Sequence, residues 1–130
     1  MNEVVENLYI SERIVAENLP EDEYKVLMIS LYPLRREHVQ VAIADCVPWP
    51  CETVELVINT ISSWLAEGET VCVACDAGIS RSASGIMAYL MSRGMSVDEA
   101  TDIIKSKRGI TRPHPLIVES IVKCLSQKKD

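Results

Sequence analysis

The sequence predicts an α/β fold with a largely parallel central sheet flanked by helices, and three observations lead to that fold class. The chain has 130 residues, which is about the length of one domain. Its composition, 48% apolar and 25% charged, excludes a disordered or fibrous chain. Short apolar runs alternate with longer stretches of helical periodicity, a pattern that favours a parallel sheet covered by helices. We therefore expect a single domain over residues 1–130.

Four short runs of apolar, β-branched residues are bounded by turn residues, and each run predicts a strand. The runs cover residues 8–11, 26–31, 39–43 and 70–74. The last run leads directly into Cys75. Because parallel sheets place their ligands at the carboxyl ends of the strands, the junction after residue 74 is the first expected position of a functional site.

Four helices are predicted, each with recognisable signals at its ends. They cover residues 52–67, 81–93 and 96–109, and the stretch from residue 113 onward. Gly68 and Gly94 follow the first two helices as stop signals, and the second helix is apolar on nearly every side, which suits a central position. Ser96-Val97-Asp98-Glu99 has the spacing of a capping box. Pro113 and Pro115 begin the last helix.

The charge distribution argues against nucleic acid and membrane partners. The net charge is −6, so the chain as a whole is repelled by nucleic acid and by anionic lipid. Residues 1–100 hold six basic and sixteen acidic side chains, whereas residues 101–130 hold seven basic and three. The first six residues are acidic where a presequence would be basic, and no apolar run reaches the length of a membrane span. A cytoplasmic location is the expectation.

The five cysteines are an odd number and have no histidine cluster beside them. This usage predicts neither a disulfide framework nor a zinc site, and it favours a reducing compartment. The cysteines are Cys46, Cys51, Cys72, Cys75 and Cys124.

The segment from Cys75 to Ser82 joins the last predicted strand to the central helix. A cysteine at a helix start lies among free backbone N–H groups and the positive end of the helix dipole, which favour the thiolate form. The same N–H groups suit a bound phosphate, Gly78 permits close backbone approach, and Arg81 supplies a planar guanidinium for bidentate contact. The expected phosphate-binding residues are Asp76, Ala77, Gly78, Ile79, Ser80 and Arg81. The structural alternative is a buried, inert cysteine and a solvated arginine.

These residues resemble a known family. Cys75 to Ser84, followed by Ala88 to Met91, is similar to the signature loop and following helix of the dual-specificity branch of the cysteine-dependent protein tyrosine phosphatases. Weaker similarity extends through Asn7 to Ile10, through Asp98 to Ala100, and through Lys107 to Pro113. The resemblance implies the fold of that family over the whole chain.

The resemblance also implies a two-step reaction that the residues themselves permit. Cys75 attacks phosphorus to give a phosphocysteine, Arg81 and the loop amides hold the oxygens, and water then releases phosphate. Ser82 matches the family hydroxyl that hydrogen-bonds the cysteine sulfur and assists its departure. The implied substrate is a phosphoprotein or phosphopeptide carrying phosphotyrosine, with phosphoserine and phosphothreonine as a second class. No cofactor and no metal ion are implied, and nothing in the sequence requires more than a monomer.

The leaving hydroxyl needs a proton, and Asp45 is the candidate acid. It lies 30 residues before Cys75, after the predicted strand 39–43, where the family keeps its acid. The alternative role for Asp45 is that of a turn-forming residue. Asp76 is expected to be a solvent-facing spacer.

Two positions depart from the family pattern. Ala74 stands where the family has a histidine that supports the loop, so we expect reduced rather than absent activity. His114 stands where the family has a loop-supporting asparagine, and either a similar hydrogen bond or a helix cap would suit it. The departure at residue 74 motivates the rival hypothesis of a catalytically silent adaptor that binds phosphate.

Further alternatives stay open at this stage. The basic residues near the last proline turn suit either acidic phosphopeptides or a solvated helix face; they are Lys105, Lys107, Arg108 and Arg112. Cys46 or Cys72 would protect Cys75 as a reversible disulfide. An arsenate reductase and a sulfurtransferase share the bare Cys-x5-Arg spacing, but Asp45 and Ser82 favour phosphate chemistry. Phosphoinositide and RNA substrates are disfavoured by the lack of lysine in the loop and by the acidic net charge.

Overall fold

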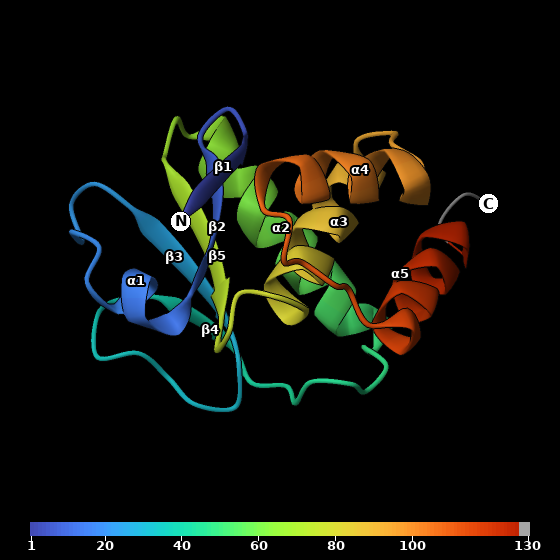
Figure 1. Ribbon diagram of the computed structural model, residues 1–130, viewed down its shortest axis with the longest axis horizontal. Coiled ribbons are helices and arrows are strands. Elements are labelled where there is room, and N and C mark those ends of the chain that lie inside the picture. Colours follow the sequence, from blue (N-terminus) through green and yellow to red (C-terminus); the bar gives the residue numbers. More distant parts are fainter. Residues whose placement is uncertain (128–130) are drawn as a thin grey trace.

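A five-stranded sheet forms the centre of the computed structural model, which describes residues 1–127 (Figure 1). The strand order is β1-β2-β5-β3-β4, and only the β1–β2 pair is antiparallel. The strands are β1 (Asn2–Val5), β2 (Leu8–Glu12), β3 (Lys25–Ile29), β4 (Val39–Val41) and β5 (Val71–Cys75). The central position of β5 places its carboxyl end in the middle of one edge of the sheet, as expected for a ligand site.

Helices cover the two faces of the sheet unequally. Three of them, α2, α3 and α4, contact the strands from one side, α5 packs on α2 and α3, and α1 lies on the other side, on the left of Figure 1. The helices are α1 (Arg13–Glu17), α2 (Cys51–Ala66), α3 (Arg81–Ser92), α4 (Val97–Lys107) and α5 (Pro115–Gln127). Within residues 1–127 no helix has the length and apolarity needed to cross a membrane.

The predicted α/β architecture is confirmed, and the four predicted strands and four predicted helices are present with ends shifted by a few residues. Gly68 and Gly94 have positive φ angles of 81° and 107°, and Ser96 and Glu99 form the predicted capping box. The sequence reading did not include β1 or α1. β1 begins with Asn2 and Glu3 and is not an apolar run, and α1 has only five residues and no side-chain cap.

The alternation of side chains along β5 determines what the functional loop rests on. Val71 and Val73 point into the large core beneath α2 to α5, whereas Cys72 and Ala74 point into the smaller core on the α1 side. All five residues of the strand are buried. Burial on both faces makes β5 a rigid support for the loop that follows Cys75.

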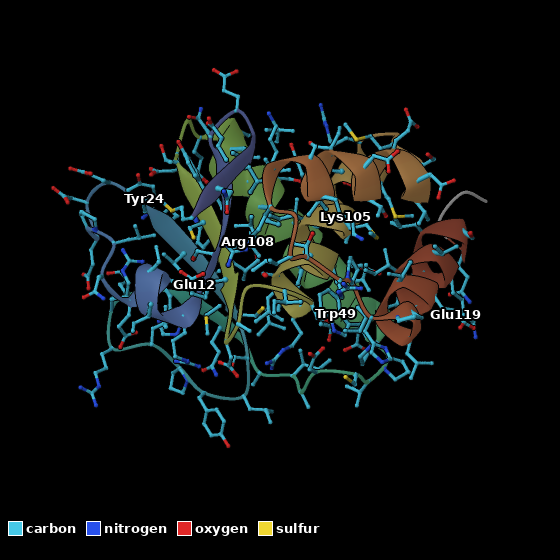
Figure 2. All side chains as sticks on the ribbon, viewed as in Figure 1. Glu12, Tyr24, Trp49, Lys105, Arg108 and Glu119 are labelled. Atoms are coloured by element: carbon cyan, nitrogen blue, oxygen red, sulfur yellow. A yellow bond between two sulfur atoms is a disulfide. The ribbon has the colours of Figure 1, made fainter. Side chains whose placement is uncertain are left out.

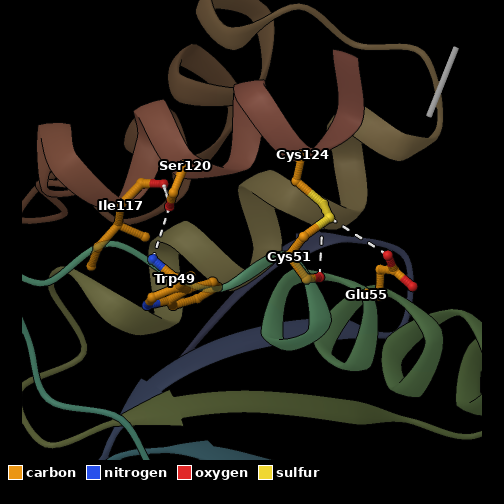
Figure 3. The surroundings of a disulfide bond; sticks show 6 residues. All are labelled: Trp49, Cys51, Glu55, Ile117, Ser120 and Cys124. Carbon is orange, nitrogen blue, oxygen red and sulfur yellow. Dashed lines mark hydrogen bonds between the residues drawn. A yellow bond between two sulfur atoms is a disulfide. The ribbon is translucent and has the colours of Figure 1, made fainter. Parts of the chain in front are cut away.

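A disulfide joins Cys51, the first residue of α2, to Cys124 in α5 (Figure 3). The expectation of no disulfide is therefore wrong. The two residues are 73 positions apart, and packing of α2 against α5 brings their Cα atoms to 5.2 Å. Cysteine spacing cannot show a pairing that only the packing of two helices creates. A hydrogen bond of 3.0 Å from Trp49 N–H to Ser120 Oγ joins the same two regions.

Reduction of the Cys51–Cys124 disulfide is expected to lower the free energy of unfolding by about 4 kcal/mol, because a cross-link over 73 residues restricts the unfolded chain. Urea denaturation with and without reductant measures the difference. Cys124→Ser should match the reduced protein and lose its sensitivity to reductant, whereas Cys46→Ser should keep it. Equal midpoints for oxidised and reduced protein would contradict this expectation.

Candidate active site

Cys75 ends β5 and lies at the mouth of the loop that leads into α3. Its side chain is buried, and its Sγ lies 3.1 Å from Ser82 Oγ in the first turn of that helix. The predicted contact between these two residues is therefore present. A hydroxyl at this distance can donate a hydrogen bond to a thiolate and so stabilise it.

Three carbonyl groups of the loop accept hydrogen bonds from donors that lie outside both the loop and α3. They are those of Asp76, Gly78 and Ile79, which accept from Arg13 N–H (3.2 Å), Arg108 Nε–H (2.9 Å) and Arg112 N–H (2.8 Å). The described peptide bonds are all trans, so each N–H points opposite to the carbonyl of its own peptide unit. The N–H groups of Ala77, Ile79 and Ser80 are thus directed away from these three donors. Several converging backbone N–H groups form an anion-binding concavity.

The Arg81 side chain links the loop to the segment that carries Asp45. Its Nη1 donates to Ile43 O at 2.9 Å and its Nη2 to Asp76 Oδ2 at 3.1 Å. Its Nε–H is buried and has no acceptor among the described residues. A buried donor without an acceptor is destabilising, so this N–H is suited to an oxygen of a bound oxyanion.

Asp76 is not the simple spacer that the sequence suggested. Its side chain is 42% exposed, yet Oδ1 accepts hydrogen bonds from Arg13 and Ser30 while Oδ2 accepts from Arg81. Burial alone raises the pKa of Asp76, but the hydrogen bonds from these three residues together outweigh it and lower the pKa. The carboxylate therefore ties the loop to α1 and to the end of β3. No local pattern identifies Arg13 as its partner, because the two residues are 63 positions apart.

Asp45 lies beside the loop, as the sequence predicts for a candidate acid. Its Oδ1 accepts hydrogen bonds from Ser80 Oγ at 2.9 Å and from Cys46 N–H at 2.8 Å. The second bond belongs to a local turn in which Cys46 has a φ of 62°. Both the turn-forming role and the proximity to the loop are thus present. Oδ2 accepts no hydrogen bond from the described residues and is open to a substrate.

The two departures from the family pattern contribute no side-chain hydrogen bond to the loop. Ala74 is fully buried in the smaller core. His114 accepts a hydrogen bond at Nδ1 from Leu116 N–H at 3.1 Å and so caps α5, which confirms the helix-cap alternative for that residue. Support for the loop must therefore come from other residues.

The suggested protective disulfides to Cys75 are absent. Cys46, Cys72 and Cys75 are free, and Cys72 points to the opposite face of β5 from Val73 and Cys75, although Cys72 and Cys75 have Cys-x-x-Cys spacing. Burial raises the pKa of Cys72 to about 11, despite a contact with Ser11 Oγ at 3.2 Å. Cys72 is therefore an inert core thiol.

The four basic residues near the last proline turn differ in how exposed they are. Lys105, Lys107 and Arg112 are exposed, but the side chain of Arg108 is only 9% exposed. Its Nη2 donates to Glu12 Oε2 at 2.6 Å, and its Nε reaches the loop. Neither suggested role, phosphopeptide recruitment or solvation, describes Arg108.

The ion pair between Glu12 and Arg108 predicts a pH dependence of stability. The hydrogen bond from Arg108 lowers the pKa of Glu12 below its ordinary value of 4.5. The stability contributed by the pair is therefore complete above pH 4.5 and is lost as the pH falls through the lower, folded-state pKa. Urea unfolding between pH 3 and 7 should show wild type more stable than Glu12→Gln, with the difference shrinking only at the acid end. A difference that is constant with pH would contradict this assignment.

A buried cysteine and an arginine at the carboxyl end of a central parallel strand, with Ser82 beside the sulfur and Asp45 beside the loop, are together the features of the class of cysteine-dependent phosphatases. The chain belongs to one family within that class: residues 25–126 match the model of the dual specificity phosphatase catalytic domain. The predicted family is thus confirmed.

Individual relatives match shorter parts of the chain. Human dual specificity protein phosphatase 2 is 44% identical over a segment that covers 42% of this chain and 21% of that protein. A putative tyrosine phosphatase of invertebrate iridescent virus 6 is 35% identical over 52% of this chain and 49% of its own length. The matched segments thus span about a fifth and about half of these relatives.

Solved structures match the fold over almost the whole chain. Human DUSP28 has a TM-score of 0.87 at 22% identity, with 98% of this chain and 96% of that chain covered. The human tyrosine phosphatase-like serine/threonine/tyrosine-interacting protein has a TM-score of 0.85 at 21% identity, with the same coverage. At these identities the similarity shows the fold alone.

Proposed function

We propose that this chain is a protein phosphatase that hydrolyses phosphotyrosine, and also phosphoserine and phosphothreonine, through a phosphocysteine at Cys75. The observation that carries the proposal is the Cys75–Ser82 contact of 3.1 Å at a loop whose carbonyls of Asp76, Gly78 and Ile79 face outside donors, which leaves the N–H groups of the same peptides for an anion. Membership in the dual specificity phosphatase family supports the same reaction.

The first step transfers the phosphoryl group to sulfur. The Cys75 thiolate forms the S–P bond as the bond between phosphorus and the leaving oxygen breaks, and Asp45 donates the proton that this oxygen takes up. The N–H groups of the loop and the Nε–H of Arg81 hold the three remaining oxygens. These donors are in place before charge develops, which is the main source of stabilisation in phosphoryl transfer.

The second step hydrolyses the phosphocysteine and regenerates the Cys75 thiolate. Water forms a bond to phosphorus and gives a proton to the Asp45 carboxylate, while the S–P bond breaks and its electron pair stays on sulfur. The Ser82 hydroxyl donates to the departing thiolate. Phosphate then leaves, and the thiolate and the protonated Asp45 are ready for another substrate.

The loop composition favours phosphoproteins over polyphosphorylated lipids. The Asp76 carboxylate is 42% exposed at the edge of the loop, and its lowered pKa keeps it anionic at neutral pH. Arg13 and Arg81 already pair with this carboxylate, so neither adds a free positive charge that would attract the further phosphates of a polyphosphorylated ligand. We further propose a monomer in the cytoplasm, where Cys75 stays a free thiol and the Cys51–Cys124 disulfide is open to reduction.

A phosphate-binding adaptor without turnover is the second candidate. Ala74 supports it, because this residue offers the loop no hydrogen bond, and the ion pair of Arg81 with Asp76 must rearrange if Arg81 is to bind phosphate through Nη2. The presence of the nucleophile, the acid candidate and the loop hydroxyl favours the enzyme over this alternative.

Rapid-quench mass spectrometry of the chain with para-nitrophenyl phosphate and with a phosphotyrosine peptide tests the proposal. We expect steady release of phosphate and a transient phosphate adduct on the peptide that contains Cys75. Phosphoserine and phosphothreonine peptides should also be hydrolysed. Binding of phosphopeptides without any adduct or release of phosphate would instead establish the adaptor.

A further inference from the structure

Arg108 joins four separate parts of the molecule at the end of α4. Its Nη1 donates to Asn2 Oδ1 at 2.9 Å in β1, and its Nη2 donates to Glu12 Oε2 at 2.6 Å in β2. Its Nε donates to Gly78 O at 2.9 Å in the active-site loop. Figure 2 shows Arg108 close to Glu12, between the sheet and the helices. All three of these hydrogen bonds come from one rigid, planar guanidinium group.

The contact with Gly78 determines how one peptide unit of the loop is oriented. Because the Gly78 carbonyl points to Arg108, the N–H of Ile79 in the same trans peptide points away from Arg108. Gly78 has a φ of 67°, and a Cβ atom there would lie 2.8 Å from Arg108 Nη2. The guanidinium is thus packed directly against the loop backbone, and glycine is needed for this approach.

Two described side chains donate a hydrogen bond to a carbonyl of the loop: Ser84 Oγ donates to Ser80 O at 2.8 Å from within α3, and Arg108 donates to Gly78 O from outside that helix. The Asp76 and Ile79 carbonyls are held by main-chain N–H groups, which substitution of a side chain does not remove. Ala74 and His114 offer no side-chain hydrogen bond to the loop. The charge of Arg108 is already balanced by Glu12, so its effect on an anion comes through geometry more than through long-range attraction.

We propose that Arg108 is a positioning residue for oxyanion binding: it holds the Gly78–Ile79 peptide so that the Ile79 N–H donates to the bound phosphoryl group. This inference rests on the proposed function for its role in turnover. Its role in oxyanion binding is independent of turnover.

The test compares three variants by calorimetric titration with inorganic tungstate, by kcat and KM for para-nitrophenyl phosphate, and by urea unfolding. Arg108→Lys keeps the positive charge near Glu12 but lacks the planar fork that reaches Asn2, Glu12 and Gly78 at once. We expect its Kd for tungstate to rise about tenfold and kcat/KM to fall about 10- to 100-fold. Lys107→Ala removes a neighbouring exposed cation and should change each value less than twofold. Glu12→Gln keeps an oxygen that can accept from Arg108 Nη2, so it should weaken the fold while changing the tungstate Kd less than threefold.

The outcomes separate the possibilities. A folded Arg108→Lys with wild-type tungstate affinity overturns the proposal, as does an affinity loss in Glu12→Gln equal to that in Arg108→Lys, which would indicate a purely structural role. A wild-type chain that binds tungstate but hydrolyses nothing overturns the proposed function alone. A wild-type chain that binds no tungstate overturns the positioning role together with the anion site.

Discussion

Replacement of Cys75 by serine is expected to reduce hydrolysis of para-nitrophenyl phosphate by at least about 10⁴-fold, because the reaction loses its nucleophile. An alcohol keeps its proton through the physiological pH range, and the group next to this position is the Ser82 hydroxyl, 3.1 Å away, which is not a base. The Arg81 side chain and the loop amides are unchanged by the substitution. Oxyanion binding should therefore persist while turnover disappears.

Steady-state kinetics and tungstate titration of the same preparation measure the two effects separately. Cys46→Ser serves as the matched control, because Cys46 is an exposed free thiol near Asp45 and should leave kcat within about twofold of wild type. If Cys75→Ser kept more than a hundredth of the wild-type rate, another group would be the nucleophile. If it lost tungstate binding as well, the substitution would have disrupted the loop rather than the chemistry.

The part of the site that sequence could predict is the part that is contiguous in the chain. Cys75, Arg81 and Ser82 belong to one loop between a buried strand and a helix, so their spacing carries the information. Asp45 could be proposed because it follows the strand that ends at Val41 and therefore reaches the same edge of the sheet. The alternation of side chains between the two faces of β5 also follows from the sequence, once the strand is assigned.

The supports of the loop could not be predicted because they depend on packing. Arg108 and Gly78 are 30 positions apart, and Arg13 and Asp76 are 63 apart. An arginine in a basic stretch looks the same in sequence whether it is exposed, like Arg112, or buried, like Arg108. Only the close approach of α4 to β1 and β2 distinguishes the two.

Replacement of Asp45 by asparagine is expected to lower kcat about 100-fold for a phosphotyrosine peptide, and by much less for para-nitrophenyl phosphate, because general acid catalysis matters most when the leaving group is a strong base. Asparagine keeps an oxygen that can accept from Ser80 Oγ and Cys46 N–H, so the local turn should survive. What the variant lacks is a proton that it can donate to the leaving oxygen.

A series of aryl phosphates whose leaving phenols range from weakly to strongly basic tests this role of Asp45. For Asp45→Asn, kcat/KM should fall steeply as the leaving phenol becomes more basic, whereas wild type should show a shallow dependence. Glu52→Gln, an exposed substitution in the first turn of α2, is the control and should reproduce the wild-type slope. An equal loss for every leaving group would mean that Asp45 acts only through its hydrogen bond to Ser80. In that case the proton must come from solvent or from another acid, and the position of Asp45 beside the loop would be purely structural.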